Sequence, residues 1–270
     1  MRACWWYVAA CLLALVLSVG IASDVIAKSK GDFALKGYDI KSTGLEPRYP
    51  AGFTCSPLTS LYASWIDVDG TRRTEAHSGV DGGRLGDPIL APGAGTVRGV
   101  WEADWGWGRE GALLIKHTPR QLNLHDRAAF YYSEFDHLSY ADIRDLKVGQ
   151  NISRGDLLAY VFRPGGNDEY LPEVHWEVWE IGEGDDLTWS TNKYGGKYWI
   201  NESARLIDPL YMLARNTPPA EDGSVAIAPF IENKNYAGFK GFTYILPCWR
   251  RPDGLNQGKL TQSSKGQSVP

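Results

Sequence analysis

The sequence predicts a mainly β fold with long loops and short helices. Its 30 glycines and 15 prolines favour turns, and its 11 Trp, 14 Tyr and 8 Phe are residue types enriched in strands. The stretch from Leu171 to Trp179 alternates apolar and polar residues with period two, which indicates a β-strand. A chain of 270 residues is long enough for one or two domains and a sizeable core.

The first 27 residues are interpreted as a targeting segment. Arg2 supplies a positive charge, residues 4–21 are apolar, and small residues follow, so that cleavage after Ala22 or Ala27 fits a signal peptide. The apolar run is also long enough for an uncleaved membrane anchor, and this alternative stays open. In either case we expect export to the periplasm or cell envelope. A net charge of −4 without basic runs gives no support for nucleic-acid binding.

The next elements are short. Residues 28–50 are polar and interrupted by Gly and Pro, so we expect an extended lead-in to a domain over residues 51–216. Strands are predicted around 60–66, in short pieces over 86–100, and at 112–117, 128–138, 157–162 and 171–179. Ser139 with Asp142 three residues on resembles a capping box, which predicts a short helix to Asp145. A second helix is predicted at 206–215, and a long loop at 182–196.

The composition changes after Asn216. Residues 217–223 are acidic and contain two prolines, which is typical of a linker. Residues 224–249 carry apolar stretches and are expected to pack back onto the domain. Residues 250–270 are polar and contain Gly, Gln and Ser, which is typical of disorder.

Two cysteines remain once the targeting segment is set aside. They are Cys55 and Cys248, near the two ends of the exported part. Two cysteines in an exported chain most simply form a disulfide. Two separate buried thiols are the alternative.

The strand at 171–179 carries polar residues on one face. Glu173, His175 and Glu177 share that face, which is either solvated or part of a site. His77 and Asp81 favour a site, because His and Asp suit zinc and two groups from one stretch plus one from a distant strand make a three-ligand centre. Three protein ligands leave a position open for water, which is the catalytic arrangement of zinc.

A series of motifs follows one another over roughly residues 73–213. They are His77-Ser78-Gly79-Val80-Asp81, Gly86 to Ala91 with Gly95-Thr96-Val97, Ile115-Lys116-His117, Asp136-His137-Leu138-Ser139, Val148-Gly149 to Gly155, Glu173-Val174-His175-Trp176-Glu177, and Asp208-Pro209. In this order they resemble the lysostaphin-like, LytM-type zinc peptidoglycan endopeptidases. The resemblance implies antiparallel sheets that form a groove, of the duplicated hybrid motif type. It also implies Zn²⁺ bound by His77, Asp81 and His175, and a catalytic His137 that polarises water or holds the oxyanion.

Position 173 departs from this pattern. The family usually has a histidine there that acts as general base, whereas this chain has Glu173. A carboxylate two residues from a ligand on one strand face is about 6–7 Å along the strand. A Glu side chain bridges that distance, and Glu is the base in many zinc hydrolases. We therefore expect Glu173 to be catalytic.

Other residues are secondary candidates. Glu177 and His117 are candidates for supporting the site from outside the ligand set, Glu177 by orienting a ligand, and a structural role in their strands is the alternative for both. His125 lies in a polar insertion and is expected at the surface. A group of aromatic residues could line a groove and stack on sugar rings, or belong to the core: Trp105, Trp107, Tyr194, Tyr198 and Trp199.

These observations favour an exported zinc endopeptidase that hydrolyses peptide cross-links of peptidoglycan. The main alternative is a degenerate module that binds peptidoglycan or activates a partner cell-wall hydrolase. Retention of three metal ligands argues against that alternative, and the change at position 173 argues for it. A zinc peptidase that acts on proteins is a third hypothesis.

Overall fold

The computed structural model describes residues 40–251 of the chain. The predicted targeting segment and nearly all of the predicted polar tail lie outside these residues. Within them the protein is mainly β, with antiparallel sheets and short helices, as expected from the sequence. No helix in this part is long and apolar enough to cross a membrane.

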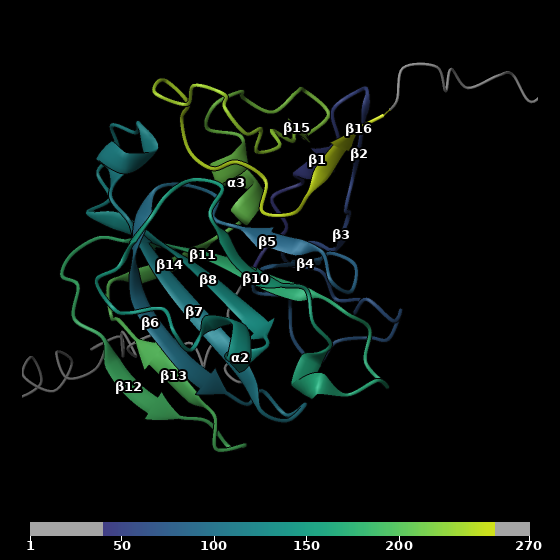
Figure 1. The fold of residues 1–270 in the computed structure, drawn as a ribbon, viewed down its shortest axis with the longest axis vertical. Helices are drawn as coiled ribbons and strands as arrows, with labels where there is room; N and C mark the ends of the chain where they lie inside the picture. The colour runs from purple at the N-terminus through teal and green to yellow at the C-terminus, as the bar shows by residue number, and fades with distance from the viewer. Residues whose placement is uncertain (1–39, 252–270) are drawn as a thin grey trace, which may run out of the picture.

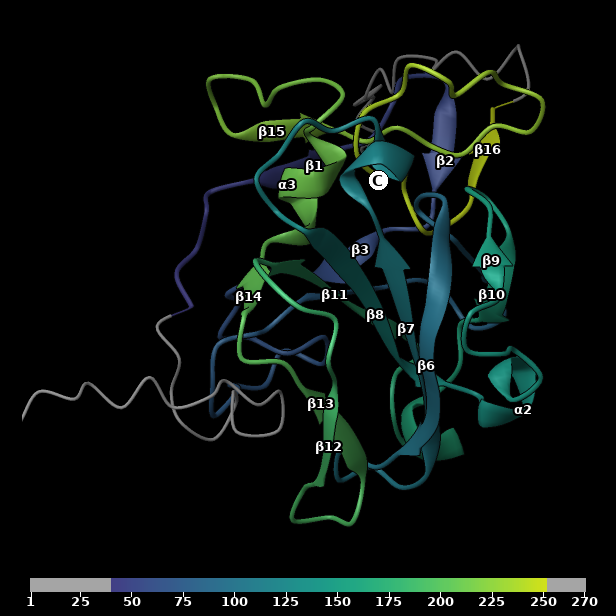
Figure 2. The ribbon, with the colours of Figure 1, turned by 90° about the vertical axis from the view of Figure 1, so that its left-hand side faces the viewer.

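One antiparallel sheet forms the centre of the described part of the chain (Figures 1 and 2). The strand order is β3-β4-β11-β8-β7-β6-β9, and β14 pairs with the second half of β11. The strands are β3 (Leu58–Ser60), β4 (Val80–Gly82), β6 (Gly95–Ala103), β7 (Glu110–His117), β8 (Phe130–Leu138), β9 (Asn151–Ile152), β11 (Val174–Ile181) and β14 (Ala204–Ile207). Strand β11, which contains most of the predicted Leu171–Trp179 strand, therefore lies in the middle of this sheet.

Smaller elements surround the central sheet. Two-stranded pairs are formed by β1 (Glu46–Arg48) with β15 (Ser224–Ala226), β2 (Phe53–Cys55) with β16 (Cys248–Arg250), β5 (Pro88–Leu90) with β10 (Leu157–Tyr160), and β12 (Thr188–Thr191) with β13 (Lys197–Ile200). The helices are α2 (Tyr140–Ile143) and α3 (Pro209–Leu213), with 3₁₀ turns at Pro119–Leu122 and Pro164–Gly166. Figure 2 shows the β12–β13 hairpin at the end of the molecule opposite β1, β2, β15 and β16.

The two ends of the described chain are joined to each other. Strand β1 runs parallel to β15, and β2 pairs antiparallel with β16. Cys55 and Cys248 are register partners in the second pair and form a disulfide, the linkage expected from the cysteine count. The described part of the segment after residue 216, which ends at residue 251, therefore packs onto the domain and is fastened to its beginning.

The alternation along β11 separates two cores. Val174, Trp176 and Val178 belong to the larger core, which residues 225–246 help to cover. Trp179, on the opposite face, belongs to a smaller core with Trp101 and Trp199. Because His175 and Glu177 share the face of Trp179, the polar side chains predicted for one face of this strand do lie together.

Several element predictions are corrected by the structure. The strand predicted around 60–66 ends at Ser60, and turns follow to residue 79. The loop predicted at 182–196 instead contains β12 and the turn to β13. The helix predicted at 206–215 begins only at Pro209, because Asp208 caps it by accepting from the Leu210 amide while residues 204–207 pair with β11. The helix after Ser139 ends at Ile143, and the Ser139 side chain makes no capping hydrogen bond.

Candidate metal centre

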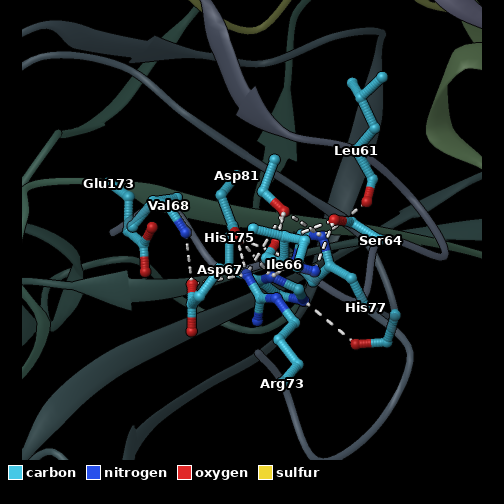
Figure 3. Close-up of polar contacts among 12 residues, drawn as sticks. Leu61, Ser64, Ile66, Asp67, Val68, Arg73, His77, Asp81, Glu173 and His175 are labelled. Atoms are coloured by element: carbon cyan, nitrogen blue, oxygen red, sulfur yellow. Dashed lines mark hydrogen bonds and ion pairs between the residues drawn. The ribbon is translucent and has the colours of Figure 1, made fainter. Parts of the chain in front are cut away.

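Strand register brings two predicted ligands together. In the β4–β11 pair, Asp81 lies directly opposite His175, so their side chains share one face of the sheet. His77 approaches from the turn before β4. The atoms His77 Nε2, Asp81 Oδ1 and His175 Nδ1 form a triangle with sides of 3.0, 2.8 and 3.0 Å (Figure 3). The three residues predicted to bind metal therefore converge, and all three are buried.

The ring nitrogens that face away from the triangle fix the tautomers of both histidines. His77 Nδ1 donates to the backbone carbonyl of Leu61 at 3.0 Å, so its lone pair is on Nε2. His175 Nε2 donates to Glu177 Oε1 at 3.1 Å, so its lone pair is on Nδ1. The second oxygen of Glu177 accepts from Trp179 Nε1 at 2.9 Å, which holds the carboxylate in place. Glu177 thus holds the His175 ring in one orientation.

The donor set fits zinc. With both rings neutral, two imidazole lone pairs and a carboxylate oxygen face one another, and only a cation or a proton can stabilise this arrangement. Ligand atoms of tetrahedral zinc, with bonds of about 2.0–2.1 Å, lie about 3.3 Å apart, which is close to the observed triangle. Two histidines and an aspartate are also a ligand set that zinc accepts.

The three groups of the triangle have shifted pKa values. Burial alone would lower the pKa of His175, but hydrogen bonds and charges from Asp81 and Glu177 raise it to about 10. Burial lowers the pKa of His77. Burial would raise the pKa of Asp81, but the charges of the two histidines and the hydrogen bonds from them lower it well below its usual range. A proton therefore lies within the triangle at neutral pH, where a metal ion would replace it.

Arg73 supports Asp81 from behind and was not identified from the sequence. Its Nη2 contacts Asp81 Oδ2 at 2.7 Å and Asp67 Oδ1 at 2.9 Å (Figure 3). This pairing occupies the outer oxygen of Asp81 and leaves Oδ1 for the triangle. The only sequence signal was a basic residue four positions before His77, which is also typical of an exposed turn.

The two predicted catalytic residues lie beside the triangle. Glu173 precedes β11 and is buried; its Oε1 lies 3.9 Å from His137 Nε2. Burial and the charge of Asp81 raise the pKa of Glu173 to about 7, against the opposing charges of His137 and His175. His137 Nδ1 lies 2.8 Å from the buried Glu110 Oε2, and Glu110 is a second partner that the sequence does not reveal.

His117 is not part of this site, contrary to expectation. It pairs with Tyr131 in the β7–β8 register and faces the larger core, on the side of the sheet opposite His175. Its Nδ1 donates to the Ala94 carbonyl at 2.8 Å and its Nε2 lies 3.1 Å from Ser133 Oγ. Burial lowers its pKa to about 4, so His117 is a neutral structural residue. His125 is exposed, as predicted.

An open cleft of about 430 Å³ leads to the triangle. Its walls include Trp105, Trp107 and Tyr194, three of the aromatic residues considered for sugar stacking. The other two, Tyr198 and Trp199, are buried. Trp199 packs edge-on against Tyr132 and Trp179 and donates to Glu134, because it belongs to the smaller core.

Comparisons with known proteins give structural matches only. No protein-family model and no curated protein sequence matches the chain. A zinc-containing peptidase from Vibrio cholerae matches at 21% identity and a TM-score of 0.34, over 57% of this chain and 36% of that one. This chain therefore spans about a third of that protein's length.

Two further matches are catalytic domains. The prophage-encoded M23 protein EnpA from Enterococcus faecalis, as a point mutant, matches at 23% identity and a TM-score of 0.33, over 50% of this chain and 87% of that one. The antimicrobial peptidase lysostaphin from Staphylococcus simulans matches at 18% identity and a TM-score of 0.30, over 54% of this chain and 88% of that one.

Proposed function

We propose that this protein is an exported zinc metallopeptidase that hydrolyses peptide cross-links of bacterial peptidoglycan. The observation that carries the proposal is the triangle of His77, Asp81 and His175 atoms at an open cleft, with Glu173 and His137 beside it. A bound zinc would supply Lewis acidity toward a scissile carbonyl and toward water.

Glu173 has the properties of a general base. Its Oε2 is buried and has no hydrogen-bond partner within residues 40–251, so it is free to accept a proton. A pKa raised to about 7 lies near neutral pH, where base catalysis is most effective. His137 Nε2 lies on the other side of the same space and would donate a hydrogen bond to the carbonyl oxygen as it gains negative charge.

The substrate class and the location rest on the sequence. The order of motifs from His77 to Pro209 resembles that of peptidoglycan endopeptidases. The apolar segment at residues 4–21 and the Cys55–Cys248 disulfide support export, since disulfides persist in oxidising compartments. The N-terminal segment is a cleaved signal or a membrane anchor.

Glu173 also supports one competing function. A module that binds peptidoglycan or activates a partner hydrolase does not need a histidine at this position, and this chain lacks it. Such a module, however, would gain nothing from the fixed tautomers of His77 and His175.

The test is release of muropeptides from purified sacculi by the exported, zinc-loaded protein. Glu173→Gln should lower the rate about 10²–10⁴-fold, because general-base catalysis is worth that much, with zinc content unchanged. Glu169→Gln, an exposed neighbour, should behave as the parent does. Glu173→His, which restores the usual family residue, should keep partial activity.

Other outcomes separate the alternatives. A parent protein that binds sacculi without releasing peptides would contradict the enzyme and support the module. Cleavage of casein but not of sacculi would indicate a peptidase that acts on proteins. Equal rates for the parent and Glu173→Gln would show that Glu173 is not the base.

A further inference from the structure

His137 does not face where regular strand alternation would place it. The preceding residue, Asp136, pairs with His175 and shares its face, so His137 should point to the opposite core. Nevertheless both Asp136 and His137 line the cleft.

A β-bulge explains this orientation. The β7–β8 register passes from Gly111↔Leu138 to Leu113↔Phe135, so β8 contains one residue more than β7 at this point. His137 has a φ of 60°, in the left-handed region that residues other than glycine rarely occupy. Such a conformation persists only where its surroundings hold it, and it is typical of functional sites.

Glu110 is the side chain that holds the ring in this position. It is the first residue of β7, and its side chain is fully buried. Its Oε2 accepts from His137 Nδ1 at 2.8 Å and from the Gly165 amide at 3.3 Å. Trp107 packs edge-on against the His137 ring, with centroids 5.0 Å apart. The imidazole is thus held on two sides.

The contact with Glu110 decides which nitrogen of the His137 ring faces the cleft. Because a carboxylate oxygen accepts at Nδ1, that nitrogen carries hydrogen, and Nε2 points toward Glu173 Oε1 at 3.9 Å. Three charged or titratable groups face the His137 ring. They are Glu110 at the start of β7, Glu173 directly before β11, and His175 in β11. Burial lowers the pKa of His137 and His175 opposes its charge, but Glu110 and then Glu173 raise that pKa to about 9.

Stability alone does not explain Glu110. Its Oε1 is buried without a hydrogen-bond partner within residues 40–251. A buried carboxylate with an unpaired oxygen destabilises a fold. Such a residue is therefore retained for a reason other than stability. The requirement visible here is the orientation of His137.

We infer that Glu110 is a positioning residue that fixes His137 through Nδ1 and directs Nε2 into the cleft. Nε2 is then the ring nitrogen that meets the reacting groups beside Glu173. This inference rests on the proposed function for its effect on turnover, and on the structure alone for the state of the ring.

The test compares Glu110→Gln and Glu110→Ala with Glu102→Gln, a half-exposed residue on the adjacent strand β6. Gln keeps an acceptor for Nδ1 but removes the charge, whereas Ala removes both. We expect kcat on a soluble muropeptide to fall about 10²-fold in Glu110→Ala and about tenfold in Glu110→Gln, with KM unchanged. Glu102→Gln should match the parent.

A second readout is independent of turnover. In ¹⁵N-histidine NMR spectra of the full protein, the parent should show His137 with a hydrogen on Nδ1 and a raised pKa. Both Glu110 variants should lower that pKa, and Glu110→Ala should also lose the preference for a hydrogen on Nδ1. If the parent cleaves nothing, these spectra alone decide the inference, and only the proposed function fails.

Two results would overturn the inference. One is a kcat in Glu110→Ala equal to that of the parent, and the other is an unchanged His137 signal and pKa in both variants. If Glu110→Ala fails to fold, as judged by circular dichroism and zinc content, kcat and the His137 spectrum are measured on Glu110→Gln alone. The expected fall in kcat is then about tenfold.

Discussion

Zinc binding should release a proton from His175. Hydrogen bonds and charges from Asp81 and Glu177 raise the pKa of His175 to about 10 against the effect of burial, so in the metal-free protein its Nδ1 carries a proton at neutral pH. A metal must displace this proton. At pH 7 only about one ring in 10³ is deprotonated, which weakens apparent zinc binding by about 4 kcal/mol relative to a free ring.

The sign and size of the pH dependence follow from these values. Because the proton competes with zinc, acid weakens binding, and the apparent association constant should rise about tenfold per pH unit between pH 6.5 and 9. His77, whose pKa burial lowers, is already neutral there and adds nothing. Glu173, with a pKa raised to about 7 by burial and by Asp81, is about nine-tenths ionised at pH 8 and adds little.

Isothermal titration calorimetry measures this release directly. Zinc is titrated into the chelator-treated protein at pH 8 in buffers of different ionisation enthalpy. The dependence of the apparent enthalpy on that of the buffer should give about one proton per zinc. A value near zero, or an affinity that does not vary with pH, would refute the presence of a proton on His175 Nδ1 in the metal-free protein.

Two further predictions concern residues outside the ligand triangle. Arg73→Met should weaken zinc binding about 10–100-fold in a chelator competition, because Asp81 Oδ2 loses its 2.7 Å partner, whereas Arg72→Met should not; equal affinities would contradict this. Replacing Cys55 and Cys248 by Ser should lower the free energy of unfolding by about 5 kcal/mol in urea, because the disulfide closes a loop spanning 193 positions. A loss below about 1 kcal/mol would mean that burial alone holds the C-terminal segment.

The proposed metal ligands could be predicted because each lies in a short local pattern. His77 and Asp81 come from one turn and strand, and the alternation around His175 gave its face correctly. Strand pairing then brings them together, since Asp81 and His175 are direct partners in the β4–β11 register. The sequence contains no comparable pattern for that register.

The two charged residues that support the site could not be predicted, because the sequence does not show which strands and turns come together. Arg73 and Glu110 are charged residues in a turn and at a strand end, where most such residues are solvated. Their functions arise from tertiary contacts with Asp81 and His137. The bulge that turns His137 into the cleft is a feature of the strand pair and leaves no mark on β8 alone.

The prediction that His117 supports the site was wrong for a related reason. Its place at the end of a predicted strand was correct, since β7 ends there. Which face of the sheet it occupies depends on the register with β8, and that register turns it toward Phe242 and the larger core.

Metal content is the most direct test of the central claim. The protein, purified and dialysed with zinc, is measured by inductively coupled plasma mass spectrometry beside His77→Ala, Asp81→Ala, His175→Ala and the exposed control His125→Ala. We predict about one zinc per chain in the parent and in His125→Ala, and close to none in the other three. Stoichiometric zinc retained in His175→Ala, or none in the parent, would contradict the account.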